Sequence, residues 1–163
     1  MIRAIVKDPD PVLYKKCHAV SKFDDKLGEL LDDMAQTMMA ANGVGLAGPQ
    51  VGLVRRVCVV LDTSDNDKII EMVNPEVVET SGEQTGLEGC LSFPGQFGEV
   101  TRGQTCTVRA QDRHGEFFTI TREGLTARAF QHEIDHLDGH VFKEKATAMY
   151  SDADVEPIPE GEE

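Results

Sequence analysis

The sequence predicts an α+β fold, in which mixed or antiparallel β-sheets pack around a central helix that carries an H-E-x-x-H motif. Three observations predict it: an apolar stripe at helical spacing near residues 24–41, alternating apolar and polar residues over 105–121, and a helical segment from Gly124 to about Leu137. With 163 residues and a hydrophobic content of 40%, the chain is long enough for one domain with a real core.

The N-terminal helix is expected to run to about Ala41, with Asp24 or Asp25 capping its first turn. Its apolar stripe consists of Leu27, Leu30, Leu31, Met34 and Met38. The pair Asn42-Gly43 is typical of a helix end. We expect this stripe to pack in the core rather than to bind a ligand.

Strands are expected between the two helices. Arg56–Asp62 is a short apolar run, and Ile69–Thr80 is an extended segment that Asn74-Pro75 interrupts. Thr105–Asp112 and Glu116–Thr121 alternate on either side of His114-Gly115, which predicts a hairpin. The cysteines of these segments, Cys58 and Cys106, and the earlier Cys17 are expected to be packing residues.

The second helix, from Gly124 to about Leu137, contains the motif Gln131-His132-Glu133-Ile134-Asp135-His136, and Gly139 follows its end. His132 and His136 are four residues apart, so a helix projects both imidazoles from one face, where they can hold one metal ion. Glu133 points beside the ion rather than onto it, which is the place of a general base.

A third protein ligand is needed for such a site. Downstream of the motif the available side chains are poor: Asp138 and His140 are too close along the chain, and Glu144 is only possible. Cys90, between Gly89 and Pro94 on an expected tight loop, is a better ligand, but the residues alone leave a buried packing cysteine equally open.

The stretch Gly43-Val44-Gly45-Leu46-Ala47-Gly48-Pro49-Gln50 could by itself be a helix end followed by a turn. It is not a phosphate-binding loop, because no G-K-[ST] follows and a helix rather than a strand precedes it.

Three separated segments resemble the peptide deformylase family. Gly43 to Gln50 is similar to the family motif G-x-G-L-A-x-x-Q, Glu88 to Ser92 matches E-G-C-L-S, and Gln131 to His136 matches Q-H-E-x-D-H. The segments come in the family's order, Pro9 to Leu13 is similar to its opening segment, and the resemblance covers about residues 1–145. All three motifs in order are far more specific than H-E-x-x-H alone.

The resemblance implies a hydrolase that removes the formyl group from N-formylmethionine of newly synthesised polypeptides and releases formate. It implies one divalent ion on Cys90, His132 and His136, and a metal-bound hydroxide that attacks the formyl carbon with Glu133 as general acid and base. The other implied catalytic groups are the Gln50 side chain and the Leu91 N–H. The implied substrate-binding residues are Val44, Gly45, Gly89, Leu125 and Arg128. Iron(II) is the implied native ion, while zinc, nickel and cobalt also suit these ligand types.

The chain departs from the family pattern at a few positions. Phe97 stands where some members carry an arginine that contacts the substrate, and Arg128 stands where some have an apolar residue that lines the methionine pocket. The methylene stem of Arg128 can still cover a methionine side chain. Arg102 is expected either to pair with Glu88, to contact the substrate, or to lie on the surface. Gly48 replaces a common alanine, with little expected consequence.

The net charge of −13 argues against broad binding to nucleic acid or to anionic membranes. No apolar run is long enough to span a membrane, and the N-terminus has no secretion signal. The four cysteines are scattered without paired spacing, which favours a reducing compartment. We therefore expect a cytoplasmic protein.

The sequence divides into an expected catalytic domain over residues 1–148 and an acidic, Pro-containing, disordered tail over 149–163. Some deformylases continue into a C-terminal helix that helps them bind the ribosome. The expected tail offers no such helix, so only a transient proximity to the ribosome is expected.

Two other function classes remain open at this point. An H-E-x-x-H endopeptidase would require the third ligand to come from downstream. A noncatalytic metal-binding domain would need no general base, so the presence of Glu133 and Gln50 beside the ligands argues against it.

Overall fold

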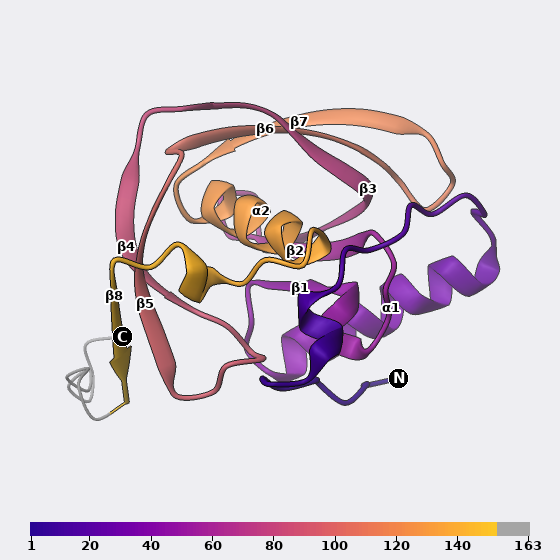
Figure 1. Ribbon diagram of the computed structural model, residues 1–163. Helices are drawn as coiled ribbons and strands as arrows, with labels where there is room; N and C mark the ends of the chain where they lie inside the picture. The colour runs from indigo at the N-terminus through magenta and orange to yellow at the C-terminus, as the bar shows by residue number, and fades with distance from the viewer. Residues whose placement is uncertain (153–163) are drawn as a thin grey trace.

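The computed structural model describes residues 1–152, which form two antiparallel β-sheets around a central helix (Figure 1). The five-stranded sheet has the strand order β1-β2-β3-β6-β7, and the three-stranded sheet has the order β4-β5-β8. The strands are β1 (Gly45–Ala47), β2 (Val57–Asp62), β3 (Lys68–Ser81), β4 (Gln84–Gly89), β5 (Gln96–Arg102), β6 (Thr105–Gln111), β7 (Phe117–Glu123) and β8 (Ala148–Ser151). The helices are α1 (Asp25–Ala40) and α2 (Gly124–Leu137), with short 3-10 turns η1 (Pro11–Tyr14), η2 (Gly48–Val51) and η3 (Phe142–Glu144). The predicted α+β class is confirmed.

The N-terminal helix forms as its sequence predicts. The Asp24 carboxylate accepts a hydrogen bond from the backbone N–H of Leu27 and caps α1. Every residue of the predicted apolar stripe is buried, in a cluster that also contains Leu46, Val57, Val59 and Val73. After the last turn Asn42 has a φ of 57°, the left-handed conformation that ends many helices.

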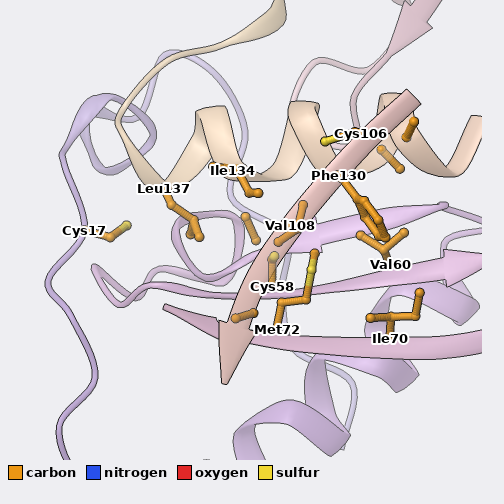
Figure 2. Close-up of a cluster of buried hydrophobic side chains, with 14 residues drawn as sticks. Cys17, Cys58, Val60, Ile70, Met72, Cys106, Val108, Phe130, Ile134 and Leu137 are labelled. Carbon is orange, nitrogen blue, oxygen red and sulfur yellow. The ribbon is translucent and has the colours of Figure 1, made fainter. Parts of the chain in front are cut away.

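Strand β2 is apolar on both faces because each face packs against a different helix. Val57 and Val59 belong to the cluster under α1, whereas Cys58 and Val60 belong to the cluster under α2. In Figure 2 the cluster under α2 joins Phe130, Ile134 and Leu137 of the helix to side chains of the sheet. All four cysteines are free, and Cys17, Cys58 and Cys106 are buried, as predicted for packing residues. Helix α2 is therefore held firmly on the five-stranded sheet by apolar packing.

The predicted interruption of the long strand β3 lies at Asn74, whose φ is 50°. Its side-chain amide donates hydrogen bonds to the Val20 carbonyl and to Gln111 Oε1, both within 2.9 Å. The pairing register between β3 and β6 shifts between Val73 and Glu76. The second half of β3 then reaches Gly82, where the chain turns into β4 of the three-stranded sheet. This crossing carries Glu88 and Cys90 towards α2.

The start of α2 is tied to the sheet by the buried carboxylate of Asp62 at the end of β2. This side chain is fully buried and accepts hydrogen bonds from Ser64, from Arg122 Nε at 2.8 Å and from Thr126 Oγ1 at 3.2 Å. Burial raises the pKa of this carboxyl group, but the hydrogen bonds from Ser64, Arg122 and Thr126 outweigh it and lower the pKa to about 2.

We expect Asp62→Asn to destabilise the protein at neutral pH but not in strong acid. A carboxyl group whose pKa is lowered from 3.8 to about 2 by folding contributes stability above pH 4, and this contribution is lost as the pH falls through 2. The shift is equivalent to at most about 2 kcal/mol. The check is the free energy of unfolding of both proteins as a function of pH. A difference that stays constant from pH 7 down to pH 2.5 would contradict this account.

The three-stranded sheet and strand β1 were not predicted from the sequence. The predicted boundary at residue 148 lies at the start of β8, and residues up to Ser151 pair with Gln96–Glu99 of β5. The first residues of the expected tail are therefore part of a sheet, because they find an unpaired edge at β5. The remainder of the expected tail, residues 153–163, lies outside the described residues.

No helix of the described residues is both long and apolar enough to cross a membrane.

Candidate metal centre and active site

Three predicted ligands meet at one point between α2 and the end of β4. His132 and His136 project from the same face of α2, and their Nε2 atoms are 3.2 Å apart. Cys90 follows the last residue of β4, and its Sγ lies 3.3 Å from His136 Nε2. A turn in which the Phe93 N–H donates to the Cys90 carbonyl at 2.9 Å presents the thiol to the helix.

The downstream alternative for the third ligand is absent from this cluster. Glu144 lies on the surface, where its carboxylate is 3.0 Å from His140 Nδ1. Among the described residues, the group of side chains close enough to share an ion consists of Cys90, His132 and His136, with all three ligand atoms within 4.8 Å of one another. The downstream ligand expected of an H-E-x-x-H endopeptidase is therefore not near the two histidines.

The donor atoms fit a divalent transition-metal ion. In a tetrahedral Cys-His-His site the ligand atoms are separated by about 3.3–3.6 Å, since the metal–nitrogen and metal–sulfur bonds are about 2.0 and 2.3 Å long. The observed separations of 3.2 and 3.3 Å are close to these values. Thiolate and imidazole suit zinc, iron(II), cobalt and nickel.

The electrostatics of the site also favour a cation. Burial lowers the pKa of His132, but the nearby Glu133, Cys90 and Glu88 outweigh it and raise this pKa well above its usual value. Burial lowers the pKa of His136 and keeps that imidazole neutral, as a ligand must be. So much negative charge around one imidazole attracts positive charge, which a bound metal ion supplies.

Glu88 orients the first histidine, a role that the sequence did not reveal. Glu88 Oε1 lies 2.6 Å from His132 Nδ1, so Nδ1–H donates to the carboxylate and leaves Nε2 free for a metal ion. Arg102 donates to both oxygens of Glu88, at 2.6 and 2.8 Å, and also to Asp135 at 2.9 Å. Burial raises the pKa of Glu88, but the bonds from His132 and Arg102 outweigh it and hold the pKa well below its usual range. Of the three roles expected for Arg102, the structure shows the pairing with Glu88.

The side chain of Glu133 is buried beside the ligands without joining them. It is 4% exposed, and its Oε1 atom has no hydrogen-bond partner in the described part of the chain. Burial raises its pKa to about 7, although His132 counteracts part of this rise. A carboxylate with a pKa near neutrality can both accept and release a proton.

Gln50 is held against the same centre by its own turn. It is 1% exposed on η2, and its Oε1 accepts a hydrogen bond from the Ala47 N–H at 3.0 Å. This bond turns the amide NH2 towards Cys90 Sγ, at 3.6 Å, and towards Ser92 Oγ, at 3.2 Å. Leu91 follows Cys90 directly, and its side chain packs against the cluster under α1. Both residues border the space beside the three ligands.

A cleft of about 390 Å³ opens onto this centre. One wall is formed by β1 and the other by β4. Each of these strands is the outermost strand of its sheet, so one backbone edge of each is free of a neighbouring strand. All five substrate-binding residues predicted from the sequence line this cleft: Val44, Gly45, Gly89, Leu125 and Arg128. An extended peptide could add as a strand to such free edges.

Comparison with known proteins identifies the family. The family model described as "Polypeptide deformylase" matches residues 2–151. The chain belongs to the polypeptide deformylase family.

Individual deformylases are similar over nearly their whole length. Peptide deformylase 1 of Bacillus anthracis is 53% identical over 152 residues, which cover 93% of this chain and 97% of that relative. The crystal structure of a peptide deformylase from Legionella pneumophila is 45% identical with a TM-score of 0.86, and the match covers 90% of this chain and 87% of the other. That of peptide deformylase from Thermotoga maritima is 38% identical with a TM-score of 0.86, covering 91% and 99%.

Phe97 and Arg128, two of the positions at which the chain departs from the family pattern, line the cleft. The ring of Phe97 covers Gly89, since a Cβ added to that glycine would lie 3.3 Å from the ring. The guanidinium group of Arg128 is directed at Glu88, with Nη1 2.5 Å from Oε2. The guanidinium group of Arg128 is therefore bound to the wall, and the methylene stem is the part of this side chain that is left to line the cleft.

We expect Gly45→Ala to inactivate the deformylase without removing its metal. A Cβ on Gly45 would collide with Glu133, meeting Oε2 and lying 2.8 Å from Cδ, so the carboxylate must move. Displacing a general base, the role proposed below for Glu133, costs about 100-fold or more in kcat. Steady-state kinetics together with metal analysis by emission spectroscopy checks this. Unchanged kcat would show that Glu133 does not work from its observed position.

Proposed function

We propose that this protein is a metal-dependent hydrolase that removes the formyl group from N-formylmethionine at the start of newly made polypeptides. The observation that carries the proposal is the position of the buried Glu133 carboxylate beside the group of Cys90, His132 and His136, at the inner end of a cleft with strand edges on both sides. Membership of the polypeptide deformylase family supports it.

The three ligands would hold one divalent ion, which supplies Lewis-acid polarisation and a hydrolytic nucleophile at neutral pH when it is bound. Iron(II) is proposed as the native ion, with zinc, nickel or cobalt as alternatives that the same ligands accept. Glu88 would keep His132 in the tautomer that ligation requires, because it accepts the Nδ1 hydrogen.

The remaining chemistry falls to side chains and backbone groups of the cleft. Glu133 would take a proton from the attacking water as the new C–O bond forms at the formyl carbon. It would then deliver that proton to the methionine nitrogen as the C–N bond breaks, so that formate and a free amine leave. The Gln50 amide and the Leu91 N–H would donate to the formyl oxygen as charge develops on it, each contributing roughly 3 kcal/mol.

Substrate placement would use the edge of β1. The backbone of Val44 and Gly45 would pair with the extended peptide, and glycine permits its close approach. The methionine side chain would enter the cleft between Leu125 of α2 and the β4 wall that ends at Gly89, against the stem of Arg128. Acting on new polypeptides, the enzyme would work in the cytoplasm, in transient proximity to ribosomes.

The direct test is formate release from formyl-Met-Ala-Ser by protein purified anaerobically with iron(II), or reconstituted with nickel or cobalt. We expect rapid release that a chelator abolishes and that returned metal restores. Acetyl-Met-Ala-Ser is the matched control, since it differs only at the group that is removed. Fully metallated, folded protein that releases no formate would overturn the proposed function.

A further inference from the structure

The three-stranded sheet and α2 meet along a polar seam. The apolar cluster under α2 contains residues of the five-stranded sheet and none of β4 or β5. The cluster of the small sheet contains Val100 with Phe93, Val141 and Phe142, and none of α2. Within the described residues, side-chain hydrogen bonds and ion pairs therefore take the place of apolar packing at this seam.

Arg128 makes the most extensive set of these bonds. It is 7% exposed and lies one helical turn before His132, on the face of α2 that meets β4 and β5. Its Nη1 atom donates to Glu88 Oε2 at 2.5 Å, while Nη2 donates to the backbone carbonyls of Gln84 at 3.2 Å and Val100 at 3.1 Å. One guanidinium group thus joins α2 to both strands of the wall.

Glu88 does not depend on Arg128 for its own charge balance. Arg102 already binds both of its oxygens, and His132 donates to Oε1. The bond from Arg128 is therefore additional to a carboxylate that is otherwise satisfied. Arg128 contributes instead by holding groups in place, because a planar guanidinium group has several fixed donors and can bridge three acceptors at once.

We propose that Arg128 is a positioning residue that clamps strands β4 and β5 to α2 and thereby sets the width of the cleft that receives the first side chain of the substrate. The inference rests on the proposed function for the identity of that side chain. With its guanidinium group fixed on the wall, the stem of Arg128 is held still as part of the cleft lining. A fixed width lets the cleft discriminate between side chains of different shape, such as unbranched methionine and branched leucine.

The test compares Arg128→Met, which keeps an unbranched stem without the guanidinium group, with the wild type. We expect KM for formyl-Met-Ala-Ser to rise roughly tenfold while kcat stays within about threefold, since Glu133 and the ligands remain in place. Arg128→Lys keeps the charge, but a single ammonium cannot occupy the same bridging position between both strands and Glu88, so its KM should also rise. If Arg128→Met does not fold, the Arg128→Lys variant is used for the same comparison.

Binding without turnover separates this inference from the proposed function. Titration calorimetry of nickel-loaded protein with methionine hydroxamate and leucine hydroxamate measures the preference for the unbranched side chain. We expect this preference to fall at least about fivefold in both Arg128 variants. Wild-type protein that releases no formate would overturn the proposed function, while the hydroxamate comparison would still decide the role of Arg128.

The matched control is Arg122→Met. Arg122 also pairs with a buried carboxylate, Asp62 at 2.8 Å, but it lies outside the cleft lining. Its replacement should lower stability and leave KM and the hydroxamate preference unchanged. The clamp is overturned if either Arg128 variant has wild-type KM and wild-type preference, or if Arg122→Met changes both as much as Arg128→Met does.

Discussion

Glu133→Ala is expected to keep a full complement of metal and to lose about 1,000-fold in kcat. Glu133 is not in the group of Cys90, His132 and His136, and its buried carboxylate is the proposed general base. Removing a general acid–base group costs roughly 100- to 10,000-fold. Because Oε1 has no partner in the described part of the chain, the change removes a buried and unsatisfied group, so the free energy of unfolding should not fall.

The measurement combines formate release, metal analysis and chemical denaturation of the same preparation. Glu133→Gln is the matched variant, since it preserves the shape of the side chain and removes only its basicity. It should be as inactive as Glu133→Ala. Full activity in either variant would show that the proton is carried by another group.

Cys90→Ala is expected to lose both metal and activity. Its thiol is the proposed ligand that follows β4 of the three-stranded sheet, while the two proposed histidine ligands come from α2. Two histidines on one helix are a weaker site than a complete set of three, so metal affinity should fall at least about 100-fold. Competition with a chromogenic chelator measures this affinity directly.

Cys106→Ala is the matched control for the loss of a thiol. Cys106 is fully buried in the cluster under α2 and is not part of the ligand group. Its replacement should lower stability through lost packing and leave the metal stoichiometry at one. A Cys90→Ala protein that retains its metal as tightly as the Cys106 control would remove Cys90 from the ligand set.

The two helices and the hairpin of β6 and β7 could be predicted because their signals are local. Helix α1 shows its cap at Asp24 and its stripe within one short stretch, and α2 shows a run without proline between Gly124 and Gly139. The break in β3 was visible at Asn74-Pro75. Each of these features depends on residues a few positions apart, so spacing and turn chemistry suffice.

The three-stranded sheet could not be predicted in the same way. Strand β4 alternates around small and polar residues, as in Thr85-Gly86-Leu87, and most of its residues are partly or fully exposed. Strand β8 pairs with β5 across about fifty residues of chain. Strand β4 pairs with the next strand, β5, but lacks the apolar alternation that would reveal it, whereas β8 depends on a partner that is distant along the chain.

By itself, the sequence determined the chemical groups of this protein: two histidines one helical turn apart, the carboxylate between them, and a glycine-flanked cysteine. Resemblance added the cysteine to the ligand set, where the residues alone left two possibilities open. Only the tertiary structure decided that Cys90 reaches the histidines, that Glu88 holds His132, and that the charge of Arg128 faces the wall rather than the cleft. The physical reason is that spacing along a helix determines which side chains share a face, whereas the partners of that face come from segments that only folding brings together.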